Sequence, residues 1–155
     1  MHEKFRDVLA GEKPWPVYLH GAVGCGKTCA ALAVLDRVIG SRRYFTAGDF
    51  VDRAIKAAKG ELYAGDYRVH EGEFWREWQQ CVFTVMDELG TREKVPDWHY
   101  EIVYKAVNYR YGMPSIWISN HSLDDLAGLY DERLASRLAE GTVIEIQGDD
   151  RRLQR

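Results

Sequence analysis

The chain of 155 residues is 46% hydrophobic and 29% charged, a composition that fits one folded domain and leaves little room for a second. Its 21 Lys and Arg residues stand against 24 Asp and Glu residues, and the formal net charge of −3 excludes the strongly basic balance typical of many nucleic-acid-binding proteins. Any contact with a nucleic acid must therefore come from a local basic patch. We expect a single domain over residues 1–155, with a lead-in at 1–13 and a short basic tail at 148–155.

The cysteines and the apolar runs indicate where the protein works. Cys25, Cys29 and Cys81 form no Cys-x-x-Cys pair, and no two histidines have zinc-finger spacing. Free cysteines in odd number are typical of a reducing compartment. The N-terminus is charged, and no apolar run approaches the ~18 residues that a membrane span needs. We therefore expect a cytoplasmic protein with no zinc site and no membrane partner.

Short β-type runs alternate with longer segments of helical periodicity, which is the pattern of an α/β domain with a largely parallel sheet. In chain order, we predict a strand at Val17–His20, a helix at Lys27–Ile39, a strand at Arg43–Thr46, a helix at Gly48–Lys59, a strand at Val82–Met86, a helix at Asp97–Tyr111, a strand at Ile116–Ser119, a helix at Asp131–Leu138 and a strand at Val143–Ile146.

Glycines and aromatic residues refine this scheme. Three glycines stand where helices are expected to end: Gly40, Gly60 and Gly112. The segment from Gly60 to Gly72 has no clear period, so we expect an ordered loop or a mobile insertion there. Trp75 and Trp78 are three residues apart, a spacing that favours the packed face of a helix over a platform for bases.

Residues 21–28 read Gly-Ala-Val-Gly-Cys-Gly-Lys-Thr and match the phosphate-loop pattern GxxxxGK[ST], after an apolar strand and at the start of a predicted helix. Glycines let the backbone N–H groups surround phosphate oxygens, and the helix N-terminus adds a favourable dipole. Lys27 would reach the β- and γ-phosphates, and the Thr28 hydroxyl would bind Mg²⁺. The predicted nucleotide-binding residues are Gly21, Ala22, Val23, Gly24, Cys25, Gly26, Lys27, Thr28 and Cys29. The alternative is a glycine turn without a ligand, and Cys25 is expected to be a small loop residue without a redox role.

An acidic pair supplies the second half of this site. Asp87 and Glu88 directly follow the apolar run that ends at Met86. Asp87 is placed to hold Mg²⁺ through its water shell, and Glu88 to orient or deprotonate a water that attacks the γ-phosphate. Alone, the pair would read as a solvated strand end, but the phosphate loop favours the catalytic interpretation. Glu88 predicts hydrolysis, because a small-molecule kinase does not place a water activator there.

From Asp87-Glu88-Leu89-Gly90 onward, the sequence resembles the DnaC-type replicative-helicase loaders (the DnaC, DnaI and IstB-like proteins) of the AAA+ ATPases. The resemblance covers roughly residues 14–153, and its other blocks are 108–111 with 114–120, and 131–138. It implies a three-layer P-loop domain of the AAA+ ASCE type, with a five-stranded, mostly parallel sheet and without the usual C-terminal helical lid.

The resemblance also implies residue roles. Asn120 is similar to sensor I, which touches the γ-phosphate and the attacking water. Arg137 looks like the arginine finger that enters the ATP site of a neighbouring subunit, with Arg133 as the competing candidate. Arg152, with Arg151 as the alternative, looks like sensor II. Taken alone, Asn120 would be a turn residue, Arg137 a helix-surface charge and the tail a frayed end. An arginine supplied by a neighbour is worth ~10³–10⁵ in rate, so hydrolysis is expected to be slow before assembly.

The family further implies a hexameric replicative helicase and single-stranded DNA as partners. A candidate DNA strip combines basic and aromatic side chains: Arg42, Arg43, Arg53, Lys56, Lys59, Phe50, Tyr63 and Tyr67. Residues 41–76 carry seven basic and six acidic side chains, so a mixed solvated surface is the alternative. About sixteen residues precede the first strand, where loaders carry a helicase-docking region. Another polypeptide could supply the docking, the chain could be an isolated ATPase domain, or it could be a minimal phage-type relative with another target.

The sequence thus predicts an AAA+ protein that binds and hydrolyses ATP with Mg²⁺, assembles with itself or with a partner ATPase, and acts in DNA replication as a helicase loader. One alternative is an ATP-switched adaptor with little hydrolysis, such as a transposition helper of the IstB type or a helicase inhibitor. The other is a P-loop kinase of a small metabolite, which the acidic pair and the helix of Arg137 disfavour.

Overall fold

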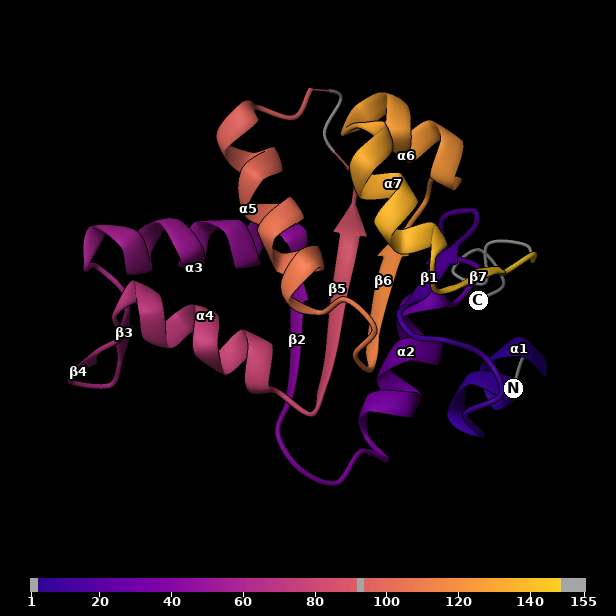
Figure 1. Ribbon diagram of the computed structural model, residues 1–155, viewed down its shortest axis with the longest axis horizontal. Coiled ribbons are helices and arrows are strands. Elements are labelled where there is room, and N and C mark those ends of the chain that lie inside the picture. Colours follow the sequence, from indigo (N-terminus) through magenta and orange to yellow (C-terminus); the bar gives the residue numbers. More distant parts are fainter. Residues whose placement is uncertain (1–2, 92–93, 149–155) are drawn as a thin grey trace.

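The computed structural model describes residues 3–91 and 94–148 and centres on a five-stranded sheet (Figure 1). The strand order is β2-β5-β6-β1-β7, and every neighbouring pair is parallel. The strands are β1 (Val17–His20), β2 (Arg42–Thr46), β5 (Phe83–Leu89), β6 (Ser115–Ser119) and β7 (Thr142–Glu145). All five predicted strands are confirmed. The largest change is at β5, which continues to Leu89, so Asp87 and Glu88 lie inside the strand and not after it.

Seven helices are present in the described residues: α1 (Glu3–Leu9), α2 (Lys27–Leu35), α3 (Ala47–Lys59), α4 (Glu71–Gln80), α5 (Asp97–Tyr109), α6 (Leu123–Leu129) and α7 (Glu132–Ala139). The four predicted helices are confirmed, whereas α1, α4 and α6 were not predicted as elements. The prediction that Lys27–Ile39 is one helix was too long, because α2 ends at Leu35 with Asp36 as its cap. Gly40 therefore lies in the following loop and does not end a helix. Gly60 does cap α3, with φ 69°, and Gly112 lies two residues beyond the cap of α5.

The helices cover both faces of the sheet, which gives three layers. On β1, Val17 and Leu19 pack with α1 and α2, while Tyr18 between them packs with α3, α4, α5 and α7. This alternation follows from the two-residue period of a strand. Among the described residues no helix follows β7. None of the helices in the described part of the chain is long and apolar enough to cross a membrane.

The segment from Gly60 to Gly72 is neither a plain loop nor an irregular insertion. It contains an antiparallel hairpin, β3 (Tyr63–Ala64) with β4 (Tyr67–Arg68), at the far end of the arm that α3 and α4 form (Figure 1). Gly65, with φ 62°, starts the two-residue turn. A glycine followed by an acidic residue between two tyrosine-containing runs is a recognised hairpin signal, and it could have been read from the sequence.

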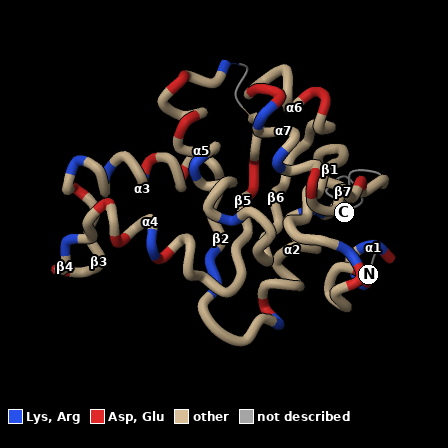
Figure 2. The backbone as a smooth tube through the Cα atoms, viewed as in Figure 1, with Lys and Arg blue, Asp and Glu red and all other residues tan. Residues whose placement is uncertain are grey.

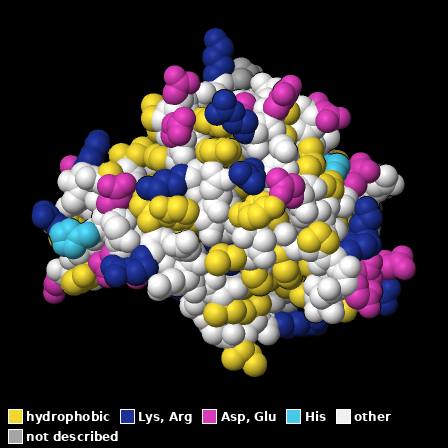
Figure 3. Space-filling view, viewed as in Figure 1, with side chains coloured by type: hydrophobic (Ala, Val, Ile, Leu, Met, Phe, Trp, Pro, Cys, Tyr) yellow, Lys and Arg dark blue, Asp and Glu magenta, His cyan; other side chains and the backbone are white. Residues whose placement is uncertain are grey.

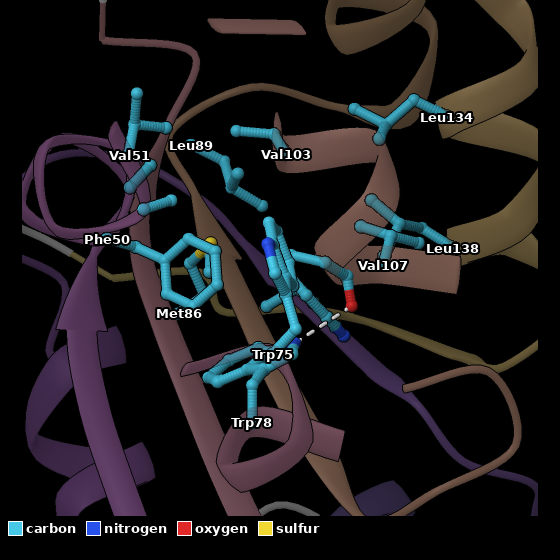
Figure 4. Packing of buried hydrophobic residues seen from close by; sticks show 14 of the residues in the cluster. Phe50, Val51, Trp75, Trp78, Met86, Leu89, Val103, Val107, Leu134 and Leu138 are labelled. Carbon is cyan, nitrogen blue, oxygen red and sulfur yellow. Dashed lines mark hydrogen bonds between the residues drawn. The ribbon is translucent and has the colours of Figure 1, made fainter. Parts of the chain in front are cut away.

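The core between the arm and the sheet combines large aromatic rings with aliphatic side chains (Figure 4). Trp75 and Trp78 are buried in α4, so the predicted packed helix face is confirmed. Trp78 Nε1 donates a hydrogen bond to the Ala106 carbonyl over 3.0 Å, and its ring lies 4.6 Å from the Phe50 ring. Arg110, only 1% exposed, donates to the carbonyls of Cys81 and Pro114 over 2.6 and 2.7 Å. This buried arginine joins the segments that lead into β5 and β6, so its role is structural.

Candidate nucleotide-binding site

The phosphate loop connects β1 to α2 at the carboxyl end of β1. Gly24 and Gly26 have φ of 78° and 96°, conformations that side chains rarely adopt. A Cβ on Gly21 would lie 2.2 Å from the Ile146 carbonyl oxygen, so only glycine fits against the segment after β7. The glycines of the motif are therefore required by this fold.

Lys27 is the charge at the centre of the loop. Its side chain is buried, and Nζ donates to the carbonyl oxygens of Gly21 and Ala22 over 2.8 and 2.7 Å. A buried ammonium group is costly unless it is paired, and neutral carbonyls compensate only part of that cost. The loop thus holds a positive charge where an anion would complete its pairing. Cys25 is buried beside Lys27, with Sγ 3.7 Å from Nζ, whereas Cys29 is exposed at the start of α2.

Asp87 lies on β5 and meets the loop through Thr28. The Thr28 hydroxyl donates to Asp87 Oδ2 over 2.6 Å, and the Glu88 N–H donates to Oδ1 over 2.7 Å. A hydroxyl and a carboxylate are the oxygen ligands that Mg²⁺ prefers, directly or through water. The residues present therefore fit a magnesium ion beside the phosphates.

Tyr44 is a member of this group that sequence reasoning missed. It lies on β2, next to β5 in the sheet, and its hydroxyl donates to Asp87 Oδ2 over 3.0 Å. Burial and the nearby Asp87 carboxylate raise the pKa of Tyr44, so the hydroxyl keeps its proton at neutral pH. No one-dimensional signal marks this residue, because its contact depends on which strand lies beside β5.

Glu88 has an unusual backbone and an exposed side chain. With φ 61° it has the only left-handed conformation among the non-glycine residues of the described chain. Such a conformation costs an L-residue about 1–2 kcal/mol and is often found at functional sites. At the same place, between Met86 and Leu89, the pairing of β5 with β6 shifts its register. The Glu88 side chain is therefore turned out of the sheet and is exposed.

Asn120 follows β6 and is placed by its two neighbours. The buried Ser119 hydroxyl donates to the Leu89 carbonyl over 2.7 Å, and His121 Nε2 lies 3.0 Å from the Gly90 carbonyl. The Tyr18 hydroxyl also donates to the His121 carbonyl over 2.8 Å, and burial raises the pKa of Tyr18 to about 12. These bonds hold the loop of Asn120 against the end of β5, the strand that carries Glu88.

One cavity of about 890 Å³ joins these residues. It is lined by Val23, Gly24, Gly26, Lys27, Thr28, Cys29, Ala30, Asp87, Glu88, Thr91, Ser119 and Asn120. The fold therefore brings together the phosphate loop, the acidic pair and the polar residue of the next strand, as the motif order predicts. Gly21, Ala22 and Cys25 do not line the cavity, although the first two accept hydrogen bonds from Lys27. Ala30, Thr91 and Ser119 line the cavity but were not predicted.

Neither candidate finger arginine lines this cavity. Arg137 lies on α7, where its guanidinium is 3.6 Å from Glu140 Oε1 and stacks over the Tyr111 ring at 5.1 Å. Arg133, on the same helix, is exposed. Asp131 caps this helix by accepting from the Leu134 N–H over 2.8 Å. Arg151 and Arg152, the sensor II candidates, lie outside the described residues.

The predicted DNA strip is wrong in part. Phe50 is completely buried among aromatic rings and cannot stack on a base. Arg42 lies at the start of β2 and donates to the Val38 carbonyl, whereas α3 begins beyond the other end of that strand, so the basic residues do not form one strip. Lys56 pairs with Asp52 at 2.7 Å. Along the arm, basic and acidic residues are intermixed (Figures 2 and 3), but Tyr63 and Tyr67 are exposed, as base stacking requires.

Comparison with known proteins supports the fold. No protein-family profile matches the chain, and a search of curated proteins finds no match. A structure of a DNA replication initiation factor has a TM-score of 0.76 at 22% identity, covering 95% of this chain and 45% of that chain. A structure of the DnaC helicase loader has a TM-score of 0.69 at 24% identity, covering 84% of this chain and 77% of the loader chain. A structure of the replication initiator DnaA bound to AMPPCP and single-stranded DNA has a TM-score of 0.67 at 23% identity, covering 86% of this chain and 40% of the DnaA chain.

The chain thus spans less than half of the initiation factor and of DnaA. It shares its three-layer α/β fold with these structures, and it has the five-stranded parallel sheet that the sequence predicts.

Proposed function

We propose that the chain binds ATP with Mg²⁺ in the cavity of the phosphate loop and hydrolyses it to ADP and phosphate. The observation that carries this proposal is the convergence of Lys27, Asp87, Glu88 and Asn120 on that cavity, from the start of α2, from β5 and from the end of β6. A protein that binds a nucleotide without hydrolysing it would need only Lys27 and Asp87. The exposed carboxylate of Glu88 supports the hydrolytic function.

Each residue has a separate role in this proposal. Lys27 and the loop N–H groups bind the phosphates. Thr28 and Asp87 would hold the magnesium ion, which neutralises charge on the phosphate oxygens when bound. Glu88 would accept a proton from a water molecule while the oxygen of that water attacks the γ-phosphorus. The bond between the γ-phosphorus and the β,γ-bridging oxygen then breaks, and ADP leaves. Asn120 would donate to the γ-phosphate or to the attacking water.

An arginine from a second subunit would complete the site. Arg137 does not line its own chain's cavity and its side chain is 42% exposed on α7, which fits a residue that acts on a neighbouring chain. On assembly, Arg137 would give up its contacts with Glu140 and Tyr111 and would instead bind phosphate oxygens of the neighbour's nucleotide. Arg133 is the alternative, and Arg152 is the proposed sensor II.

The proposed biological role is helicase loading in DNA replication. The fold is shared with the DnaC helicase loader and with a DnaA structure that contains single-stranded DNA. For DNA contact, the hairpin offers Tyr63 and Tyr67, with Arg68 stacked on Tyr63 at 5.9 Å. Base stacking on exposed aromatic rings suits a single strand. The three free cysteines suit a cytoplasmic location.

The decisive experiment combines two measurements on the purified chain. ATP turnover is measured with and without Mg²⁺ and single-stranded DNA, and co-purification with a hexameric replicative helicase is tested in the same conditions. Turnover that rises with assembly, together with helicase capture, would support the loader function. Tight ATP binding with no turnover in any condition would favour an ATP-switched adaptor instead. Phosphate transfer to small acceptors would indicate a kinase.

A further inference from the structure

Asp87 is held at both carboxylate oxygens. Oδ2 accepts from the hydroxyls of Thr28 and Tyr44, and Oδ1 accepts from the backbone N–H of Glu88. A carboxylate has about four acceptor positions, so three are filled by the protein itself. One position is left to accept a hydrogen bond from water. The direction of that position depends on the three bonds that stop the carboxylate from rotating.

Tyr44 reaches Asp87 along the strands. In the register of β2 with β5, Tyr44 lies opposite Val85, and Thr46 lies opposite Asp87. Side chains two residues apart point to the same face and are about 6.6 Å apart along the strand. A tyrosine side chain spans this distance, and its hydroxyl therefore arrives at the carboxylate from the edge of the sheet, where β2 is the outermost strand (Figure 1).

Two of the three bonds to Asp87 come from the nucleotide site itself. Thr28 is the proposed magnesium ligand, and Glu88 N–H belongs to the strained segment that carries the water activator. Both groups are expected to adjust when a nucleotide binds. Tyr44 lines no part of the cavity and belongs to a different strand. It is the one partner of Asp87 that can keep its contact while the others adjust.

We infer that Tyr44 is a positioning residue that aims Asp87 at the water shell of the magnesium ion. This inference rests on the proposed Mg–ATP site. Removing the hydroxyl leaves Asp87 free to turn, and loss of a group that orients a metal-binding carboxylate is expected to weaken magnesium affinity about tenfold. The affinity for ATP without magnesium depends on Lys27 and the loop, so it should not change.

The test is calorimetric titration of the chain with ATP, once in EDTA and then over a series of Mg²⁺ concentrations. The variants are Tyr44→Phe and Tyr44→Leu, which both lack the hydroxyl. The matched control is Tyr100→Phe, which removes a tyrosine–carboxylate bond of 2.7 Å to Asp131 at a residue that does not line the cavity. Thermal melting confirms that each variant is folded.

Both Tyr44 variants should need about ten times more Mg²⁺ for half-maximal enhancement of ATP binding, with unchanged affinity in EDTA. Magnesium dependence equal to that of the Tyr100→Phe control would overturn the inference, and so would an equal loss of ATP affinity with and without magnesium. Wild-type chain that binds no ATP in either condition would instead overturn the proposed function.

Discussion

The Thr28 hydroxyl donates a hydrogen bond to Asp87 Oδ2 over 2.6 Å, and this bond joins the phosphate loop to β5 across 59 positions of the sequence. The two residues lie close together because β5 and β1 have their carboxyl ends on the same side of the sheet, on either side of β6, and the phosphate loop starts at the end of β1. Carboxyl ends of parallel strands are the usual place for ligand sites in such sheets. The chemistry of the nucleotide site depends on this arrangement.

Replacing Lys27 by Ala should weaken ATP binding at least about tenfold, because the ammonium group makes charge-assisted bonds to the phosphates. Calorimetry measures the affinity. Lys13→Ala is the control, since Lys13 pairs with Asp7 at 2.7 Å on the surface of the N-terminal region. Equal affinities for the two variants would contradict the assignment of the phosphate loop.

The side chain of Glu88 should matter for turnover and not for binding. Glu88→Gln keeps the shape of the side chain but cannot take a proton from water, so hydrolysis should fall by about 10²–10⁴ while ATP affinity stays within a few-fold of wild type. Single-turnover phosphate release, measured beside calorimetry, separates the two effects. Full turnover in this variant would remove Glu88 from the catalytic role.

The left-handed backbone conformation at position 88 leads to a second prediction, which concerns stability. Because φ is 61°, Glu88→Gly should be more stable than Glu88→Ala by about 1 kcal/mol, although neither retains the carboxylate. Urea unfolding curves of the two variants give the difference. A glycine variant less stable than the alanine variant would show that the left-handed conformation is absent in solution.

Arg137→Ala should leave ATP affinity unchanged and lower assembly-dependent hydrolysis by about 10³-fold or more. Arg133→Ala is the matched variant on the same helix. Mixing Arg137→Ala with Lys27→Ala chains should restore part of the activity, because the first supplies an intact phosphate loop and the second an intact finger. Loss of turnover in Arg133→Ala alone would transfer the finger role to that residue.

The aromatic core should control stability without affecting the nucleotide. Trp78→Phe removes the bond from Nε1 to the Ala106 carbonyl, at a cost of about 0.5–1.5 kcal/mol. Thermal or urea unfolding measures the loss, and ATP affinity should be retained because Trp78 lies on the face of the sheet away from α2. A stability equal to wild type would contradict the buried bond.

The parts of the site that the sequence alone determined are those built from neighbouring residues. The phosphate loop is one continuous segment, and short apolar runs along the chain mark β1 and β5. The hairpin at Gly65 is also local, and its turn signal lies within four consecutive residues. The burial of Trp75 and Trp78 followed from helical spacing, which is likewise a local property.

Only the tertiary structure decided which strand lies beside β5 and which members of the predicted DNA strip are buried. Phe50 and Tyr63 were both predicted to belong to the DNA strip, yet one is inside the core and the other on the hairpin surface, because α3 turns one face to α4 and β5. Tyr44 became part of the site for the same reason. Its hydroxyl meets Asp87, 43 positions away, because the parallel sheet places Tyr44 beside Val85, and no pattern along the chain encodes that pairing.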